Sequence, residues 1–169
     1  AGVAHDRSEA KITVVGVPDQ AGKAAAIFET VATAGINIDM IVQNVSAAAT
    51  GLTDISFTLS STEGSAAMSV LSGIQAEVGF SALLYDDQVG KLSLVGAGMR
   101  SNPWVSATFF RALSDAGVNI EMISTSEIRI SVITREERLD DAARAVHAAF
   151  GLDSTAPDGE AVVYGGTGR

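Results

Sequence analysis

Residues 11–45 read KITVVGVPDQAGKAAAIFETVATAGINIDMIVQNV, and residues 91–127 read KLSLVGAGMRSNPWVSATFFRALSDAGVNIEMISTSE. The two stretches align along their length, first at an offset of 80, which places Gly16 on Gly96. Two extra residues in the second stretch then change the offset to 82, which places Gly35 on Gly117. A period near 80 residues is too long for a solenoid repeat and has the size of a small domain. The sequence therefore predicts a tandem duplication.

The hydrophobic pattern predicts the same six elements in each half, in the order βαββαβ. In the first half we expect strands over residues 11–17, 36–45, 53–59 and 80–85, and helices over 22–34 and 63–78. In the second half we expect strands over 92–97, 118–126, 128–134 and 161–164, and helices over 103–116 and 136–150. This order is typical of the ferredoxin-like α+β fold, in which two helices cover one face of an antiparallel sheet.

Two such domains are expected, one over residues 10–87 and one over 88–169. Residues 1–9 could add a strand to the second domain. The segment between the domains, residues 86–90, reads DDQVG and is too short to act as a flexible linker. We therefore expect the two domains to pack together.

The composition narrows the classes of function. The chain is 47% hydrophobic and has no cysteine, so it can bury a core but can form neither a disulfide nor a thiolate metal site. Its net charge of −9 opposes binding to nucleic acid or to an anionic membrane. No apolar run approaches the ~20 residues of a membrane span. We therefore expect a cytoplasmic protein with neither a nucleic-acid nor a membrane partner.

The motifs of common enzymes are incomplete in this chain. Gly16 and Gly22 resemble the glycines of a phosphate-binding loop, but five residues separate them instead of four, and Ala24 occupies the position of the magnesium-binding hydroxyl. The two histidines, His5 and His147, lie far apart among charged or small residues, which favours surface positions. An acylphosphatase-like activity needs an arginine in the first strand-to-helix loop, and residues 17–23 contain none. We expect neither a bound metal nor a cofactor.

One place in the first half combines groups that suit a small polar ligand. The helix that follows Asp19 begins with free N–H groups, which attract a carboxylate. On the next strand, Asp39 could hold an ammonium group and Gln43 could hydrogen-bond a hydroxyl or an amide. The alternative is structural: Asp19 would only cap the helix, and Asn37 and Asp39 would be polar residues of an edge strand.

Several of these stretches carry a family resemblance that covers nearly the whole chain. They include GVPDQAGKAA and GINIDMIVQNVS in the first half and IEMISTSEIRIS, residues 120–131, in the second. The chain resembles the tandem ACT-domain regulatory region of aspartate kinases. It is most similar to the separately made regulatory β subunit of actinobacterial-type aspartokinase. Nothing in it resembles the catalytic amino-kinase domain, so we expect no enzymatic activity of its own.

The resemblance implies effector sites formed between the first repeat of one chain and the second repeat of a partner. The residues that it assigns to effector binding are Asp19, Ala24, Asn37, Ile38, Asp39, Gln43, Val105, Ser106, Asn119, Ile120 and Ser126.

The same resemblance implies a regulatory subunit that binds threonine, with lysine in the holoenzyme, and inhibits aspartate phosphorylation. We expect a homodimer in isolation and a catalytic α subunit as the partner in the complete enzyme. The alternative is a free-standing ACT protein that senses another small amino acid and controls a different partner.

Departures from the family pattern lie in both strand-to-helix turns. Ala21 stands where related loops often have proline, which should loosen the first turn. Trp104 stands where glycine is common, and its bulk is expected to narrow or block a pocket in the second repeat. Met99 and Arg100 replace the acidic residue of that turn. We therefore expect the second repeat to act as a complementary wall and not as a complete effector site.

Overall fold

The computed structural model describes residues 2–44, 48–96, 101–152 and 162–165, the last of these by backbone alone. The chain divides into two compact units. One unit is Glu9–Asp87, and the other combines the residues up to Ser8 with those from Gln88 onward. We call them the first unit and the second unit, after the two repeats that they contain.

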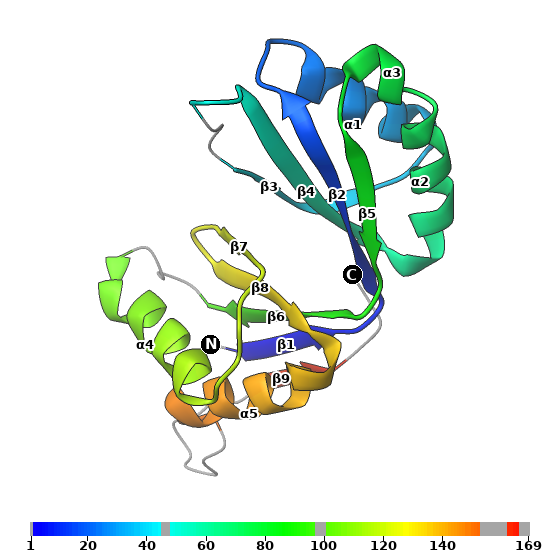
Figure 1. Ribbon diagram of the computed structural model, residues 1–169. Coiled ribbons are helices and arrows are strands. Elements are labelled where there is room, and N and C mark those ends of the chain that lie inside the picture. Colours follow the sequence, from blue (N-terminus) through cyan, green and yellow to red (C-terminus); the bar gives the residue numbers. More distant parts are fainter. Residues whose placement is uncertain (1, 45–47, 97–100, 153–161, 166–169) are drawn as a thin grey trace. The chain divides into compact units, whose positions relative to one another are not determined.

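The first unit has a four-stranded antiparallel sheet in the order β3-β4-β2-β5, with its helices on one face (Figure 1). The elements, in chain order, are β2 (Glu9–Pro18), α1 (Lys23–Thr33), β3 (Ile38–Gln43), β4 (Leu52–Ser60), a 3-10 turn (Ser61–Glu63), α2 (Gly64–Ser72), α3 (Gln75–Val78) and β5 (Ala82–Asp86). The expected ferredoxin-like arrangement is confirmed for this unit.

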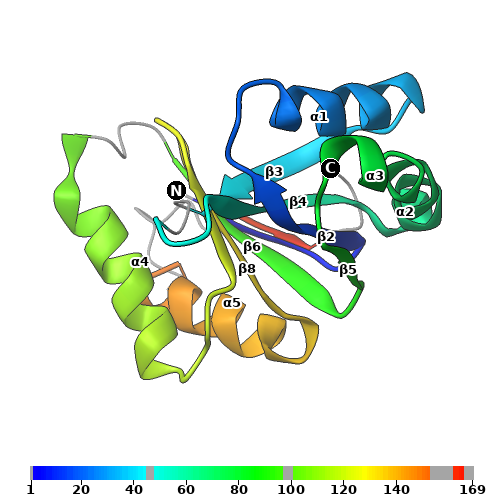
Figure 2. The same ribbon diagram turned by 45° about the horizontal axis from the view of Figure 1, so that its top comes forward.

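The second unit repeats this plan with one more strand (Figure 2). Its elements are β1 (Gly2–Asp6), β6 (Val89–Val95), α4 (Pro103–Asp115), β7 (Met122–Thr125), β8 (Arg129–Arg135), a 3-10 turn (Glu136–Arg138), α5 (Leu139–Ala149) and β9 (Val162–Gly165). The sheet order is β7-β8-β6-β1-β9. The strand β1 pairs antiparallel with β6 and parallel with β9, so it lies between the two strands that would be neighbours in a four-stranded sheet.

Each unit buries its own apolar core between the sheet and the helices. Strand β2 alternates buried and half-buried residues, as a strand with one covered face should. In the first unit the largest fully buried side chains include Ile12, Ile27 and Phe57. In the second unit Phe109 and Leu113 of α4 pack with strand residues such as Leu92. No helix among the described residues is long and apolar enough to cross a bilayer.

The helix expected over residues 63–78 is interrupted. A 3-10 turn precedes α2, which ends at Ser72, and the short α3 begins only at Gln75. The interruption falls at Gly73, which has a poor helix propensity because its backbone loses more freedom on folding than that of other residues. Apolar residues such as Met68, Leu71 and Ile74 continue at helical spacing across this break, and for that reason the pattern predicts one helix.

Candidate functional site

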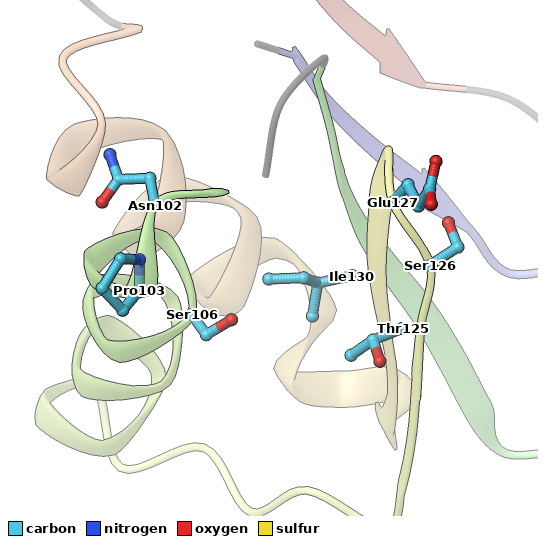
Figure 3. A pocket seen from close by; sticks show the side chains of 7 residues that line it. All are labelled: Asn102, Pro103, Ser106, Thr125, Ser126, Glu127 and Ile130. Atoms are coloured by element: carbon cyan, nitrogen blue, oxygen red, sulfur yellow. The ribbon is translucent and has the colours of Figure 1, made fainter. Parts of the chain in front are cut away.

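A hollow of about 470 Å³ lies in the second unit, where the start of α4 faces the end of β7. The residues that line it are Asn102, Pro103, Ser106, Thr125, Ser126, Glu127 and Ile130. In Figure 3 Ser106 extends from the helix and Ile130 from the sheet toward the space between them. We call this helix start and strand end the second corner.

The local sequence explains how α4 begins at the second corner. Asn102 is the N-cap, and its side-chain oxygen accepts a hydrogen bond from the N–H of Trp104 at 3.1 Å. Pro103 occupies the first helical position, where its missing N–H costs nothing and its fixed φ suits the helix. The first turn of α4 is therefore held by side chains of the second corner itself.

The strand side of the second corner ends in a tight connection. Thr125 is directly opposite Ile130 in the β7–β8 pairing, so the two side chains lie on the same face of the sheet, and Ile130 belongs to the core. The N–H of Ser126 then donates to the carbonyl of Arg129 at 2.8 Å. Glu127, within this connection, brings the only charged side chain among the seven lining residues.

The corresponding place in the first unit, which we call the first corner, joins the start of α1 to the end of β3. At the offset of 82, Ala24 corresponds to Ser106 and Gln43 to Thr125. Gln43 is directly opposite Ile55 in the β3–β4 pairing, and Ile55 is a core residue. Gln43 therefore lies on the face of the sheet that the helices cover, as Thr125 does in the second corner.

The two corners differ in how their helices begin. Gly22 is the N-cap of α1 and has a left-handed φ of 91°, and no side chain caps this helix start. There is also no acidic residue in the first turn of α1. The structural alternative in which Asp19 serves as the helix cap is therefore wrong. The N–H of Lys23 donates to the carbonyl of Gln20 at 3.3 Å, and no side chain caps the rest of the first turn, which is an arrangement that attracts a carboxylate.

An irregularity in β3 decides where Asp39 lies. The β3–β4 register shifts between Ile38 and Ile41, so one strand has an extra residue at this point. The N–H of Met40 donates to the buried hydroxyl of Thr58 at 3.0 Å. Asp39 is exposed within this bulge, and its direction is therefore set by the bulge and not by simple alternation from Gln43.

The remaining residues expected at the effector site fall into two groups. Ala24 and Ile38 in the first unit, and Val105 and Ile120 in the second, are partly buried against the cores. The polar residues expected there are exposed, and these are Asp19, Asn37, Asp39, Gln43, Ser106, Asn119 and Ser126. Of these exposed residues, Ser106 and Ser126 line the hollow of the second corner.

Five residues of this hollow were not among those expected: Asn102, Pro103, Thr125, Glu127 and Ile130. One signal could have identified Thr125, because the offset of 82 places it on Gln43. Glu127 has no such signal, because at the same offset it falls on the apolar residue Val45, immediately before a break in the alignment of the repeats.

The expectation that Trp104 blocks a pocket in the second repeat is wrong. Its side chain is 74% exposed and lines a different depression, with Ala107, Thr108 and Arg111 of the same helix. The hollow of the second corner is open beside Ser106, two positions further along α4. The other two departures in this turn, Met99 and Arg100, lie outside the described residues.

The described residues include no group of three or more histidine, aspartate or glutamate side chains that could hold a metal ion. The polar groups at the two corners are hydroxyl and amide side chains, helix starts and single carboxylates.

Comparison with protein families identifies both repeats. A family model described as the ACT domain matches residues 12–74 and again residues 92–150. Each match begins in the first strand of a repeat and ends in or near its second helical region. The two corners lie inside the matched ranges.

Curated relatives with the name aspartokinase match almost the whole chain. The protein of Mycolicibacterium smegmatis is 58% identical over 168 residues, which are 99% of this chain and 39% of that protein. The protein of Corynebacterium glutamicum is 56% identical over the same shares of the two chains. This chain therefore spans about two fifths of the length of these relatives.

Solved structures of similar length match as well. One is a chain from the crystal structure of aspartokinase alpha and beta subunits, with a TM-score of 0.83 and 44% identity over 89% of this chain and 98% of that chain. Another is the regulatory subunit of aspartate kinase from Thermus flavus, with a TM-score of 0.82 and 41% identity over 89% of this chain and 97% of that chain.

Proposed function

The chain belongs to the ACT-domain family, as a tandem ACT piece of the kind found in aspartokinase regulatory subunits, and on that premise we propose that it is a threonine sensor. On binding threonine, in concert with lysine, it inhibits the phosphorylation of aspartate by a catalytic α subunit. It makes no catalytic contribution of its own. The observation that carries this proposal is the first corner, where the start of α1 has no side-chain cap and Gln43 ends β3 on the helix-covered face of the sheet.

Threonine presents three groups, and the first corner offers a partner for each. The free N–H groups at the start of α1 would bind the carboxylate. Asp19, in the turn before the helix, would hold the ammonium group, because Asp39 lies near the start of β3, four residues or about 13 Å along the strand from Gln43. Gln43 would hydrogen-bond the β-hydroxyl, together with Ser126 of a second copy.

We assign lysine to the second corner on a separate observation, which departs from the expectation that the second repeat forms only a wall. The start of α4 is already capped by Asn102, so it suits a carboxylate less well than the start of α1. The residues that line this hollow instead include the carboxylate residue Glu127 and the hydroxyl residues Ser106 and Thr125. A carboxylate that faces a lysine ammonium contributes a charge-assisted hydrogen bond, which is stronger than one between neutral groups.

Regulation would follow from a shift in population. A ligand that binds one arrangement of the regulatory subunit more tightly than another stabilises that arrangement by the difference in binding free energy. If the favoured arrangement holds the catalytic subunit inactive, the result is feedback inhibition. By linkage, substrates that favour the active arrangement would weaken threonine binding by the same factor.

A thermal-shift and calorimetry panel of the twenty amino acids tests the sensor assignment. Threonine should raise the unfolding temperature of the purified chain, because a ligand at a hundred times its Kd adds about 2.7 kcal/mol of stability. A response to a different small amino acid alone would favour the free-standing sensor of another pathway. A chain that responds to none of the twenty would contradict the proposal.

A kinase assay tests the partner. Alone, the chain should show no aspartate-dependent consumption of ATP. Added to a separately purified catalytic α subunit, it should make aspartate phosphorylation sensitive to threonine.

The variant Glu127→Gln should weaken the response to lysine and spare the response to threonine. Equal loss of both responses would contradict the assignment of lysine to the second corner.

A further inference from the structure

Strand β2 contains a bulge at the point where it approaches the first corner. Its pairing with β4 shifts between Val14 and Val17, so Val15 and Gly16 form the irregular stretch. Gly16 has a φ of 70°, which is the left-handed region that favours glycine. A Cβ atom added at Gly16 would lie 2.4 Å from the Oγ of Ser81, so the site also excludes any larger residue without movement.

The side chain of Asp54 holds this bulge in place. Its Oδ1 accepts a hydrogen bond from the N–H of Gly16 at 2.9 Å, across the β2–β4 pair. The bulge displaces this N–H from the regular ladder, and a half-buried N–H needs an acceptor of some kind. A carboxylate that supplies it forms a charge-assisted bond, which is stronger than the neutral kind.

Asp54 also belongs to the group of residues that joins the two sides of the first corner. Its own carbonyl accepts a hydrogen bond from the N–H of Asn44 at 3.1 Å, immediately after β3. The preceding residue, Thr53, donates its hydroxyl to the carbonyl of Asn44. The N–H of Asp19 donates to the carbonyl of Gly51 at 2.9 Å. The start of β4 thus holds both the turn that leads to α1 and the end of the strand that bears Gln43.

In the second unit, a hydrogen bond between main-chain atoms holds the start of the corresponding turn. The N–H of Gly96 donates to the carbonyl of Ile128 at 2.8 Å. Arg129 is aligned with Asp54 in the repeat, and its carbonyl accepts from the N–H of Ser126 as that of Asp54 accepts from Asn44. The main-chain bond is therefore common to both repeats, whereas among the described residues a carboxylate bond to this turn is found in the first repeat, since Arg129 replaces Asp54 in the second.

From this comparison we infer that Asp54 is a positioning residue of the effector site, which sets the distance between the helix start and Gln43 without touching the ligand itself. The inference rests on the proposed function, since it requires that the first corner binds threonine. A ligand that is read by the helix end and the strand together needs a fixed spacing between them. Loss of the Gly16–Asp54 bond would let the turn move away from β3.

Calorimetric titration of the full chain with L-threonine tests this inference. The variant Asp54→Ala should weaken threonine binding by about tenfold, which corresponds to the ~1.4 kcal/mol of one strong hydrogen bond. The variant Asp54→Asn should retain most of the affinity, because its amide oxygen can still accept from Gly16. The variant Leu71→Val is the control: it removes a methylene from the buried core on α2, and it should lower the unfolding temperature without a change in Kd.

The outcomes distinguish the positioning role of Asp54 from the proposed function of the chain as a threonine sensor. If the native chain binds threonine and Asp54→Ala binds it equally well, the positioning role is overturned and the proposed function stands. If the native chain does not bind threonine, both are overturned. If Asp54→Ala does not fold, Gly16→Ala perturbs the same bulge from the other side and should also weaken binding, and native affinity in this variant would overturn the inference. Failure of Asp54→Asn to restore binding would overturn the hydrogen-bond explanation.

Discussion

Gln43 is the residue at which the choice of effector should be decided. It lies directly opposite Ile55, so it faces the helical side of the sheet at the first corner. Threonine and valine have nearly the same shape and differ chiefly in a hydroxyl group, and a side chain that bonds this hydroxyl can separate them. A neutral hydrogen bond contributes about 0.5–1.5 kcal/mol.

The variant Gln43→Ala should therefore lower the affinity for threonine by up to about tenfold and leave the affinity for valine unchanged. The ratio of the two dissociation constants, measured by calorimetry, is the relevant quantity. Ser65→Ala, a change at an exposed residue of α2, serves as the control and should change neither constant. An unaltered threonine-to-valine ratio in Gln43→Ala would mean that another group reads the hydroxyl.

Tyr85 on β5 depends on a glycine for its position. Its ring lies against Gly64 at the start of α2, where an added Cβ atom would be 2.4 Å from the hydroxyl oxygen. Desolvation of the ring raises the pKa of Tyr85 above 10.0, and the negative charge of Asp87 raises it further. A raised pKa in the folded state means that the contribution to stability is complete below the unfolded pKa and is lost as the pH rises through the folded pKa.

We expect Asp87→Asn to lower the pKa of Tyr85, and Gly64→Ala to lower it further by pushing the ring into solvent. The absorbance of tyrosinate measures both changes, in a Tyr164→Phe background so that Tyr85 is the one tyrosine left of the two in the chain. The unfolding temperature of the native chain should fall more steeply above about pH 10 than that of Asp87→Asn. Identical titration curves in all variants would show that neither group acts on the ring.

At the scale of elements, the sequence predicts the order and type of nearly every helix and strand. It does so because the amphipathic period of each segment is local information, as in the alternation of β2 and the helical spacing of α4. The bulges at Gly16 and around Asp39 could not be predicted in this way. An extra residue in one strand shows only against its partner, and the partner is found by tertiary pairing.

For the site, the sequence predicts the two strand-to-helix turns better than what surrounds them. The first corner follows from the turn over residues 19–22 and a polar strand end, both of which are visible in the chain. The hollow beside Glu127 needs the connection between β7 and β8 to bring its end near α4, and nothing local encodes that proximity. That Trp104 leaves the hollow open could not be predicted for the same reason, since the direction of a side chain at a helix start depends on the turn before it.

The start of α4 gives a prediction at this scale. The variant Asn102→Ala removes the N-cap and should lower the stability of the second unit by about 0.5–2 kcal/mol. Asn102→Asp keeps an oxygen that can accept from the N–H of Trp104, and it should remain close to the native stability. Chemical denaturation measures both, with Trp104 as the fluorescent probe because it is the single tryptophan of the chain. Equal stability of Asn102→Ala and the native chain would mean that the cap contributes nothing.

At the scale of the whole molecule, the chain connectivity ties the second unit to the N-terminal strand. Val3 of β1 is 1% exposed and belongs to the second core, and β1 bonds to strands on both sides. Deletion of residues 2–6 should therefore loosen the unit that begins at Gln88 and spare the unit Glu9–Asp87. Hydrogen exchange followed by mass spectrometry measures the protection of backbone amides in each unit separately. The variant Val3→Ala should give a smaller loss of protection in the same unit. An equal loss of protection in both units would contradict the prediction that only the unit beginning at Gln88 depends on β1.

Exposed isoleucines on two edge strands bear on how copies of the chain assemble. Ile41 on β3 and Ile123 on β7 occupy the same position in the two repeats, and they are 52% and 47% exposed. Both strands are at the end of their sheets, where exposed apolar residues favour pairing with another chain. We therefore expect a homodimer that these edges help to form.

Ile41→Lys should shift the chain toward monomer in sedimentation at micromolar concentration, because a lysine on an edge strand opposes pairing. Leu84→Lys is the matched control, since Leu84 is 58% exposed on β5 at the opposite edge of the same sheet as β3.

Threonine should strengthen the native dimer, because a ligand held by groups from two copies links binding to association. A native chain that stays monomeric at saturating threonine would contradict the shared site, and Leu84→Lys as disruptive as Ile41→Lys would place the interface at a different edge.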